Sequence, residues 1–205
     1  MALDFDIESL FDNGTFDPVA YQYFHQLFDR RTVLFNDGID ENIVEKVYLP
    51  LREFESDDLD KPVTLIINSM GGSVTDGFFL AHYIAHYKKQ LNIIITGCAA
   101  SMAAIILAGG GNNPKVKRSC FPCSYALIHD GYVAISASET KTAQDVMAFN
   151  ESVDAQIRQF IIDNTNITAE QYDAHARKQW FLTAEEMKKL NLVDEILYED
   201  ESNGN

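Results

Sequence analysis

A stretch of small residues between two apolar segments constrains the fold of this chain more than any other feature. The β-branched residues Ile93 to Ile95 are typical of a buried strand, and the segment from Met102 to Leu107 is typical of a helix. The turn between them, from Thr96 to Ala100, contains no charged or bulky side chain. A strand that runs into a helix through such a turn predicts an α/β fold and leaves Ser101 at the start of the helix.

Ser101 has two interpretations at that position. The first backbone N–H groups of a helix lack partners within the helix and carry partial positive charge, so they can stabilise an oxyanion that forms beside a nucleophilic serine. Alternatively, Ser101 only caps the helix, which is a position that serine favours. The segment around Ser101 does not decide between the two.

Two further predicted strands end in residues that suit the same chemistry. The apolar strand Val63 to Ile67 leads to the paired glycines Gly71 and Gly72, and the run from Ser124 to Asp130 contains His129 at its end. Successive parallel strands bring their ends to one edge of a sheet. Taken singly, the glycines indicate a tight turn and the histidine a solvated polar residue. Together with Ser101 they indicate a nucleophile, a base and an oxyanion donor.

These segments resemble the ClpP family, the proteolytic subunits of Clp proteases, which are serine peptidases with a crotonase-like fold. The resemblance covers roughly Arg31 to Leu197. It is carried, in chain order, by Asn68-Ser69-Met70-Gly71-Gly72, Gly97-Cys98-Ala99-Ala100-Ser101-Met102-Ala103, Ile128-His129, Phe181-Leu182-Thr183-Ala184-Glu185-Glu186 and Leu192-Val193-Asp194.

The resemblance implies a fold, a mechanism and a set of site residues. The fold would be an α/β spiral of ββα units with a protruding handle helix, spanning residues 24–198. Ser101 would be the nucleophile and His129 its general base, and the N–H groups of Gly72 and Met102 would form the oxyanion hole of an acyl-enzyme reaction. The residues expected to contact substrate are Gly71, Ser73, Val74, Gly131 and Tyr132.

One departure from the family falls on the third member of the triad. Family members carry an aspartate two residues before the phenylalanine of the C-terminal motif, and this chain has Gln179 there. A glutamine oxygen can orient the histidine but cannot stabilise its positive charge, and loss of that charge costs about 10⁴ in kcat in the serine-protease example. The possible substitutes are Asp130, Asp163 and Asp173.

Other departures concern the loops and the ends of the chain. Met70 stands where the family usually has proline, and the loop from Gly109 to Arg118 looks longer than usual. The acidic, aromatic residues 1–23 do not match the N-terminal hairpin of family members that work with a AAA+ unfoldase, so that partner is undecided. We expect residues 1–23 to form a separate arm and residues 199–205 a polar tail.

The predicted function is a serine endopeptidase that cleaves unfolded proteins or short peptides inside an oligomeric chamber. By resemblance the chain forms a homo-oligomer, a heptamer or tetradecamer, through the helix at 139–162. Its apolar residues are Val146, Phe149, Val153, Ile157, Phe160 and Ile161.

Three alternatives to an active Clp peptidase remain. Gln179 suggests a weakly active or inactive ring subunit with a structural or regulatory role. The missing axial loop suggests a phage-type protease that processes capsid proteins. The same fold also hosts acyl-CoA hydratases and isomerases, which do not need Ser101 paired with His129.

Composition narrows the partners and the compartment. A net charge of −15 argues against nucleic-acid binding. Three cysteines and no charged-then-apolar leader predict a cytoplasmic protein.

Two residue pairs have the spacing of metal ligands. Cys120 and Cys123 have CxxC spacing, and His82 and His86 are four residues apart, but neither pair has further ligands, so we expect no metal and no cofactor. The uncharged run from Leu91 to Gly111 could span a bilayer by length, yet its glycines and alanines favour the strand-turn-helix interpretation instead of a membrane segment.

Local patterns predict several further elements. Thr32 to Phe35 is typical of a strand, and Glu41 to Glu55 of an amphipathic helix that Pro50 should kink. Asn191 replaces the usual glycine after a helix end. Capping boxes are expected at three helix starts: Ser136 with Glu139, Thr168 with Gln171, and Thr183 with Glu186.

Overall fold

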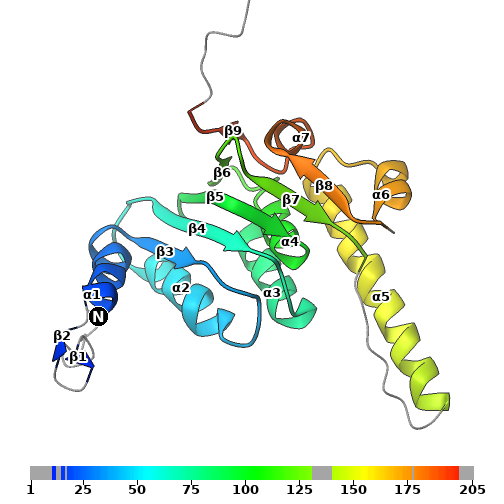
Figure 1. The fold of residues 1–205 in the computed structure, drawn as a ribbon, viewed down its shortest axis with the longest axis horizontal. Coiled ribbons are helices and arrows are strands. Elements are labelled where there is room, and N and C mark those ends of the chain that lie inside the picture. The colour runs from blue at the N-terminus through cyan, green and yellow to red at the C-terminus, as the bar shows by residue number, and fades with distance from the viewer. Residues whose placement is uncertain (1–10, 13–14, 17, 131–139, 177, 199–205) are drawn as a thin grey trace, which may run out of the picture.

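A parallel sheet with helices packed against it forms the centre of the computed structural model (Figure 1). The structure describes residues 11–12, 15–16, 18–130, 140–176 and 178–198. The strands there are β1 (Phe11–Asp12), β2 (Thr15–Phe16), β3 (Thr32–Phe35), β4 (Val63–Ser69), β5 (Leu91–Ala100), β6 (Val116–Cys120), β7 (Tyr125–Ile128), β8 (Trp180–Thr183) and β9 (Glu195–Ile196). The α-helices are α1 (Pro18–Phe24), α2 (Leu49–Ser56), α3 (Val74–Ala85), α4 (Met102–Ala108), α5 (Thr140–Asn164), α6 (Ala169–His175) and α7 (Ala184–Lys189), with π-helical turns η2 (His25–Asp29) and η3 (Val44–Tyr48).

The main sheet forks along strand β5. Its strands β3, β4, β5, β6 and β9 lie side by side in parallel. The first half of β5 pairs with β6, whereas Cys98 to Ala100 pair with β7. The turn between β6 and β7 is fastened to β5 at a single carbonyl group, because the N–H of Phe121 and the hydroxyl of Ser124 both donate to the oxygen of Ile95, at 3.2 and 3.0 Å. This fork confirms a mixed α/β fold with a parallel sheet.

The predicted strands are confirmed, with differences in length. The strand predicted at Thr32 to Phe35 has the same bounds in β3. Strand β4 runs on from Ile67 to Ser69, and β7 covers only Tyr125–Ile128 of the predicted run from Ser124 to Asp130. Strand β5 runs on to Ala100, so the turn predicted from Thr96 to Ala100 is wrong. The small residues that follow Ile95 stay extended because they pair with β7, a partner that lies far along the chain.

The helix predicted at Glu41 to Glu55 is irregular in its first half. Its first part forms the π-helical turn η3, and regular α-helix begins at Leu49. Pro50 has no N–H to donate to the preceding turn, so it sits in the first turn of α2, where such a donor is not needed. The irregularity predicted at Pro50 therefore lies before it, in the wider π-helical turn η3.

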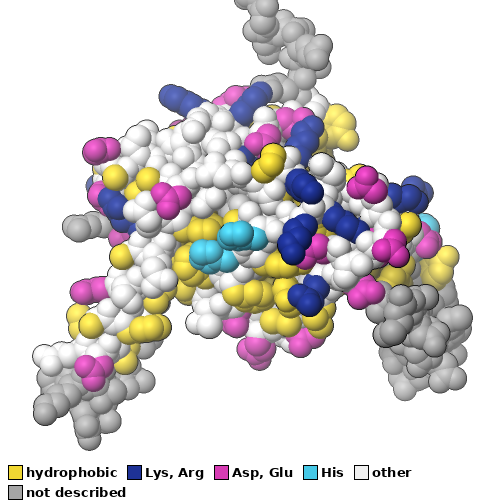
Figure 2. All heavy atoms as spheres, turned by 180° about the vertical axis from the view of Figure 1, so that it is seen from behind, with side chains coloured by type: hydrophobic (Ala, Val, Ile, Leu, Met, Phe, Trp, Pro, Cys, Tyr) yellow, Lys and Arg dark blue, Asp and Glu magenta, His cyan; other side chains and the backbone are white. Residues whose placement is uncertain are grey.

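Helix α5 protrudes from the body of the molecule (Figure 1). Its C-terminal half packs on the core through Ile157, Phe160 and Ile161, which are buried. In the protruding half, Met147 and Phe149 are exposed, and hydrophobic side chains lie along this projection at the lower left of Figure 2. The apolar side chains predicted along this helix therefore fall into two groups. Those in its C-terminal half belong to the core, and those in its protruding half are exposed in the single chain.

Two of the three predicted capping boxes are confirmed. Thr168 with Gln171 starts α6, and Thr183 with Glu186 starts α7. Asn191 adopts the expected left-handed conformation, with φ of 57°. The box expected at Ser136 and Glu139 lies outside the described residues.

Arg118 is a charged side chain in the core, with 1% of its surface exposed. Its guanidinium donates to both carboxylate oxygens of Asp194, at 3.2 and 2.7 Å, and to the backbone and side-chain oxygens of Asn191, both at 2.8 Å. The Arg118 N–H also donates to Asp194, at 2.6 Å. A buried guanidinium with this set of acceptors holds the C-terminal segment and β9 against β6.

The side chains considered for metal or redox chemistry are two cysteines and two histidines. Cys120 is buried and Cys123 exposed, both as free thiols. His82 of α3 and His86, the residue after α3, are exposed, and histidine side chains appear beside hydrophobic ones on the face in Figure 2. Within the described residues no group of three or more His, Cys, Asp or Glu could hold a metal ion. The run from Leu91 to Gly111 is divided between β5 and α4, and no described helix has both the length and the apolar character that a membrane crossing needs.

Candidate active site

The ends of three parallel strands converge around Ser101. Strand β5 ends immediately before Ser101, and the loop that follows β4 carries Gly71 and Gly72. Strand β7 ends immediately before His129 and is attached to Ser101 directly, because the Ser101 N–H donates to the carbonyl oxygen of Leu127, at 2.7 Å. The residues that the sequence analysis grouped by chemistry therefore share one edge of the sheet.

The backbone at Ser101 is strained, and its side chain is not used as a cap. Its φ and ψ angles are 54° and −124°, in a region that non-glycine residues rarely adopt. The Ser101 side chain makes no capping hydrogen bond to α4. The capping alternative is therefore wrong, and the sharp turn presents a half-exposed hydroxyl at the strand-to-helix junction.

Gly71 touches the backbone on both sides of Ser101. A Cβ atom added to Gly71 would lie 2.5 Å from the carbonyl oxygen of Ala100, 2.7 Å from the Cβ of Ser101 and 3.0 Å from the backbone nitrogen of Met102. Gly71 also has a φ of 89°, which favours glycine. Only a residue without a side chain can occupy this position, and it fixes the glycine loop against the serine turn.

The next glycine, Gly72, leaves its N–H group out of the local bridge. That bridge pairs Ile39 with Gly72, using the carbonyl oxygen of Gly71 and the N–H of Ser73, at 2.9 and 2.8 Å. Neither the Gly72 N–H nor the Met102 N–H donates to another described residue. Two backbone donors are thus available on either side of the Gly71 contact, and Gly72 itself is exposed.

His129 is half-buried at the end of β7, and its ring is oriented by a backbone group. The Nδ1 atom lies 2.6 Å from the carbonyl oxygen of Asp130. The Asp130 N–H donates to the carbonyl oxygen of Ala176, at 2.7 Å, which ties this segment to the end of α6. A carbonyl oxygen can only accept, so this contact places the proton on Nδ1 and leaves Nε2 as the basic nitrogen.

Gln179 lies at the same edge through the antiparallel pairing of β7 with β8. The last pair in that register is Ile128 with Trp180, so His129 directly follows β7 and Gln179 directly precedes β8. Gln179 is exposed. The acceptor that the structure gives to Nδ1 is the Asp130 carbonyl, where the sequence analysis expected the amide oxygen of Gln179.

The three aspartates considered as substitutes for the missing triad carboxylate differ in their surroundings. Asp173 accepts two hydrogen bonds from the guanidinium of Arg158, at 2.7 and 2.8 Å. Asp163 accepts from Gln159 on the same helix, at 2.6 Å. Asp130 lies beside His129 in sequence and lines a small cavity of about 170 Å³ with Asp154 and Tyr172. Of the three, Asp130 is the one that directly follows His129 in the sequence.

Sequence reasoning did not find Asp154. Partial desolvation and the charge of Asp130 raise the pKa of its carboxyl group. Desolvation and the charges of the same two aspartates also raise the pKa of Tyr172, to about 12. The apolar pattern of α5 marks Asp154 only as a polar position. Its interaction with Asp130 is set by the tertiary fold and leaves no signal in the sequence.

The residues expected to contact substrate have separate local environments. Gly71 packs against the serine turn, and the Ser73 hydroxyl accepts from the Asp76 N–H at the start of α3. Val74, the first residue of α3, lines a cavity of about 430 Å³ between α3 and the protruding α5. Gly131 and Tyr132 lie outside the described residues.

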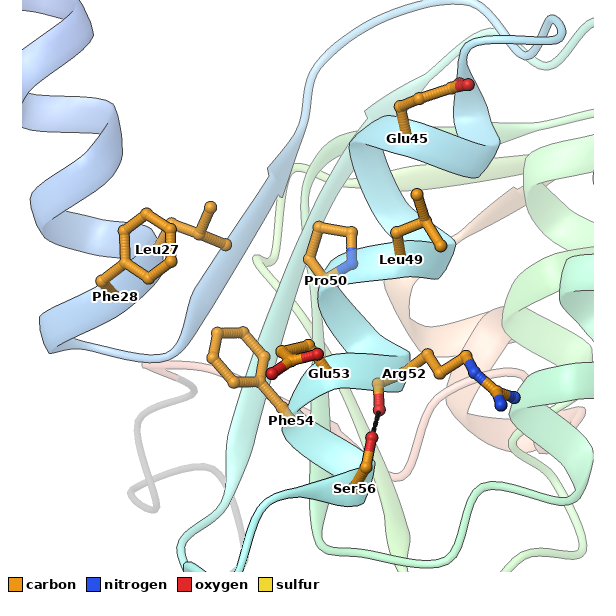
Figure 3. Close-up of a pocket in the computed structure, with 9 residues that line it drawn as sticks. All are labelled: Leu27, Phe28, Glu45, Leu49, Pro50, Arg52, Glu53, Phe54 and Ser56. Atoms are coloured by element: carbon orange, nitrogen blue, oxygen red, sulfur yellow. Dashed lines mark hydrogen bonds between the residues drawn. The ribbon is translucent and has the colours of Figure 1, made fainter. Parts of the chain in front are cut away.

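Another surface cavity, of about 420 Å³, lies away from these strand ends. Figure 3 shows Leu27 and Phe28 of η2 on one side, with Pro50 and Phe54 of α2 facing them. Its lining includes none of the predicted site residues.

The sequence of the chain also matches a model of a known protein family. The family model described as Clp protease matches residues 15–200. The chain belongs to the Clp protease family. The match extends over the glycine loop, the serine turn, His129 and the C-terminal motif, and it places the chain among the Clp-type peptidases.

We expect Gly71→Ala to disrupt the site while Gly38→Ala leaves it intact. The alanine Cβ at position 71 would overlap the Ala100 carbonyl, and the backbone there has a positive φ. A Cβ at position 38 would lie 3.8 Å from the Gly71 carbonyl oxygen, which is ordinary contact. Strain of this kind costs about 1–3 kcal/mol. Urea unfolding of both variants checks the expectation, and equal stability of the two would contradict the close contact.

Proposed function

We propose that this member of the Clp protease family is a serine endopeptidase with Ser101 as its nucleophile. The observation that carries the proposal is the uncapped Ser101 hydroxyl at a strained turn, with Gly71 packed against that turn. His129 lies one residue beyond β7, and β7 accepts the Ser101 N–H. The substrates would be unfolded proteins or short peptides.

The reaction follows from the roles available to these groups. The Ser101 oxygen attacks the peptide carbonyl carbon while Nε2 of His129 takes the hydroxyl proton. The N–H groups of Gly72 and Met102 stabilise the negative oxygen of the tetrahedral intermediate. When the C–N bond breaks, His129 returns the proton to the leaving amine, and water then hydrolyses the acyl-enzyme by the same steps.

The first test is covalent labelling of Ser101. A fluorophosphonate should add to the wild-type protein through the Ser101 oxygen, because the probe resembles the tetrahedral intermediate. Intact-mass analysis should show one adduct on the wild type and none on Ser101→Ala. Ser124→Ala is a matched control, since that buried hydroxyl only fastens a turn. Folded wild-type protein without an adduct would favour the inactive ring subunit instead.

Gln179 should make the wild-type enzyme slow. It directly precedes β8, whose first residue pairs with the residue before His129, and a carboxylate near the imidazole ring would stabilise its positive charge. Gln179→Asp should therefore increase the labelling rate and the cleavage of short fluorogenic peptides, by up to about 10⁴. Gln179→Ala is the control for a change of packing alone.

Two results would separate Gln179 from the other acidic candidates. If Gln179→Asp changes neither rate while Asp130→Asn abolishes both, the charge partner is Asp130, whose segment carries His129. Asp163→Asn and Asp173→Asn should have little effect, because those carboxylates already pair with Gln159 and Arg158.

We propose further that the chain forms a ring-shaped homo-oligomer through α5. Family members typically form oligomers and work with unfoldases. The exposed Met147 and Phe149 on the protruding half of α5 support an interface between copies. Light scattering during size exclusion should give a mass many times 23.1 kDa. Phe149→Asp should lower that mass, and a wild-type monomer would contradict the chamber.

The free thiols Cys98, Cys120 and Cys123 support a cytoplasmic location as part of this proposal.

A further inference from the structure

Met70 brings a thioether into contact with two other side chains directly beside the candidate active site. Its Sδ atom lies 3.5 Å from Cys98 Sγ, which belongs to β5, and 3.8 Å from Tyr125 Oη, which belongs to β7. Met70 immediately precedes Gly71, whose backbone packs on the Ser101 turn. The Met70 side chain is 63% exposed, whereas Cys98 is 7% exposed.

The hydrogen bonds within this cluster are weak and compete with one another. The single S–H of Cys98 has three acceptors within reach: Met70 Sδ, the Ser69 carbonyl oxygen at 3.5 Å and Asn68 Oδ1 at 3.7 Å. Tyr125 also interacts with Cys98, and this hydrogen bond raises the pKa of the Tyr125 hydroxyl. A thioether is a weak acceptor, so Met70 gains little from either donor.

We propose that Met70 is a site of oxidation to methionine sulfoxide, and that the oxidised side chain slows the chemistry at Ser101. The second part rests on the proposed function. The oxidant is a peroxide: the Met70 sulfur attacks one peroxide oxygen, an S–O bond forms, the O–O bond breaks, and the other oxygen leaves as water after proton transfer. The sulfur loses two electrons and the peroxide gains them.

A sulfoxide would change the forces on the loop. The distance of 3.8 Å between Met70 Sδ and Tyr125 Oη exceeds that of an O–H···O bond, which is about 2.7 Å. An oxygen atom on the sulfur would narrow this gap and offer Tyr125 a strong acceptor in place of a weak one. Met70 would then be held to β7, which is part of the sheet and cannot follow the loop.

The displacement would reach Ser101 through Gly71. Gly71 has no free space on the serine side, since even a Cβ atom would meet the Ala100 carbonyl oxygen at 2.5 Å. A shift of Met70 therefore moves the Gly71–Gly72 backbone as a unit and changes the distance between the Gly72 N–H and the Ser101 oxygen. Catalysis depends steeply on such distances.

The other described methionines supply internal references. Met102 and Met187 are buried, with 3% and 0% of their surface exposed, so a mild peroxide treatment should spare them. Met147 is 51% exposed on α5, far along the chain from the glycine loop. It belongs to the surface proposed above as the interface between copies, so the extent of its oxidation depends on that interface, but its oxidation should have no effect on Ser101.

The experiment uses the full chain with Cys123→Ser, which removes the exposed thiol. After hydrogen peroxide treatment, peptide mass spectrometry should find sulfoxide at Met70, and it also measures how much Met147 is oxidised. The fluorophosphonate labelling rate should fall by about 10-fold to 100-fold, the loss that a misplacement of about 1 Å can cause. A methionine sulfoxide reductase should restore it. Met70→Leu should label at the same rate before and after peroxide, whereas Met147→Leu should lose rate as the parent does.

Other outcomes would overturn the proposal. It fails if Met70 stays reduced while Met147 oxidises, or if Met70 oxidises and the labelling rate does not change. It also fails if Met70→Leu still loses rate, which would assign the effect to the Cys98 thiol. Tyr125→Phe should keep the oxidation but lose most of the rate effect, because the phenolic donor is gone.

Hydrogen exchange separates this proposal from the function itself. Protein that never labels, oxidised or not, would refute the serine peptidase. In that case amide hydrogen exchange in the peptide that covers residues 69–73 still tests the effect of oxidation on the loop. The proposal requires the exchange rate to differ between the reduced and the oxidised protein, and an unchanged rate would refute the proposal.

Discussion

The contact of Gly71 with the backbone around Ser101 is the constraint on which the site depends. It joins the loop after β4 to the turn after β5 without an intervening side chain. The loop also bridges to Ile39, so both of its sides are fixed. Because the whole arrangement is backbone against backbone, it can hold two N–H groups in place more rigidly than flexible side chains could.

The fork in the sheet supplies the other half of the site. Strand β5 exchanges β6 for β7 as its neighbour, and this brings the end of β7, and therefore His129, beside Ser101. The antiparallel strand β8 pairs with β7, and Gln179 directly precedes its first residue. The ends of β5 and β7 meet because one long strand has two successive partners.

The sequence predicted the order of strands and helices around Ser101 well and the contacts between them poorly. The glycine pair, the helix start after Ser101 and His129 could be placed because small and β-branched residues follow the local rules for strands and turns, whereas the turn predicted from Thr96 to Ala100 is strand. The pairing of Cys98 to Ala100 with β7 could not be foreseen, since it lengthens β5 beyond its apolar signal. Likewise, the acceptor at His129 Nδ1 is a backbone carbonyl, and no sequence pattern identifies such a partner.

Arg118 has a consequence for the order in which the protein can be completed during synthesis. The carboxylate that neutralises this buried guanidinium, Asp194, follows it by 76 residues. Until Asp194 has left the ribosome, β6 would have to bury a charge without its counter-ion, which is strongly unfavourable. The N-terminal strands can assemble as they emerge, but the edge of the sheet formed by β6 and β9 has to wait until the segment around Asp194 has emerged, so a nascent chain keeps that edge open over these 76 residues.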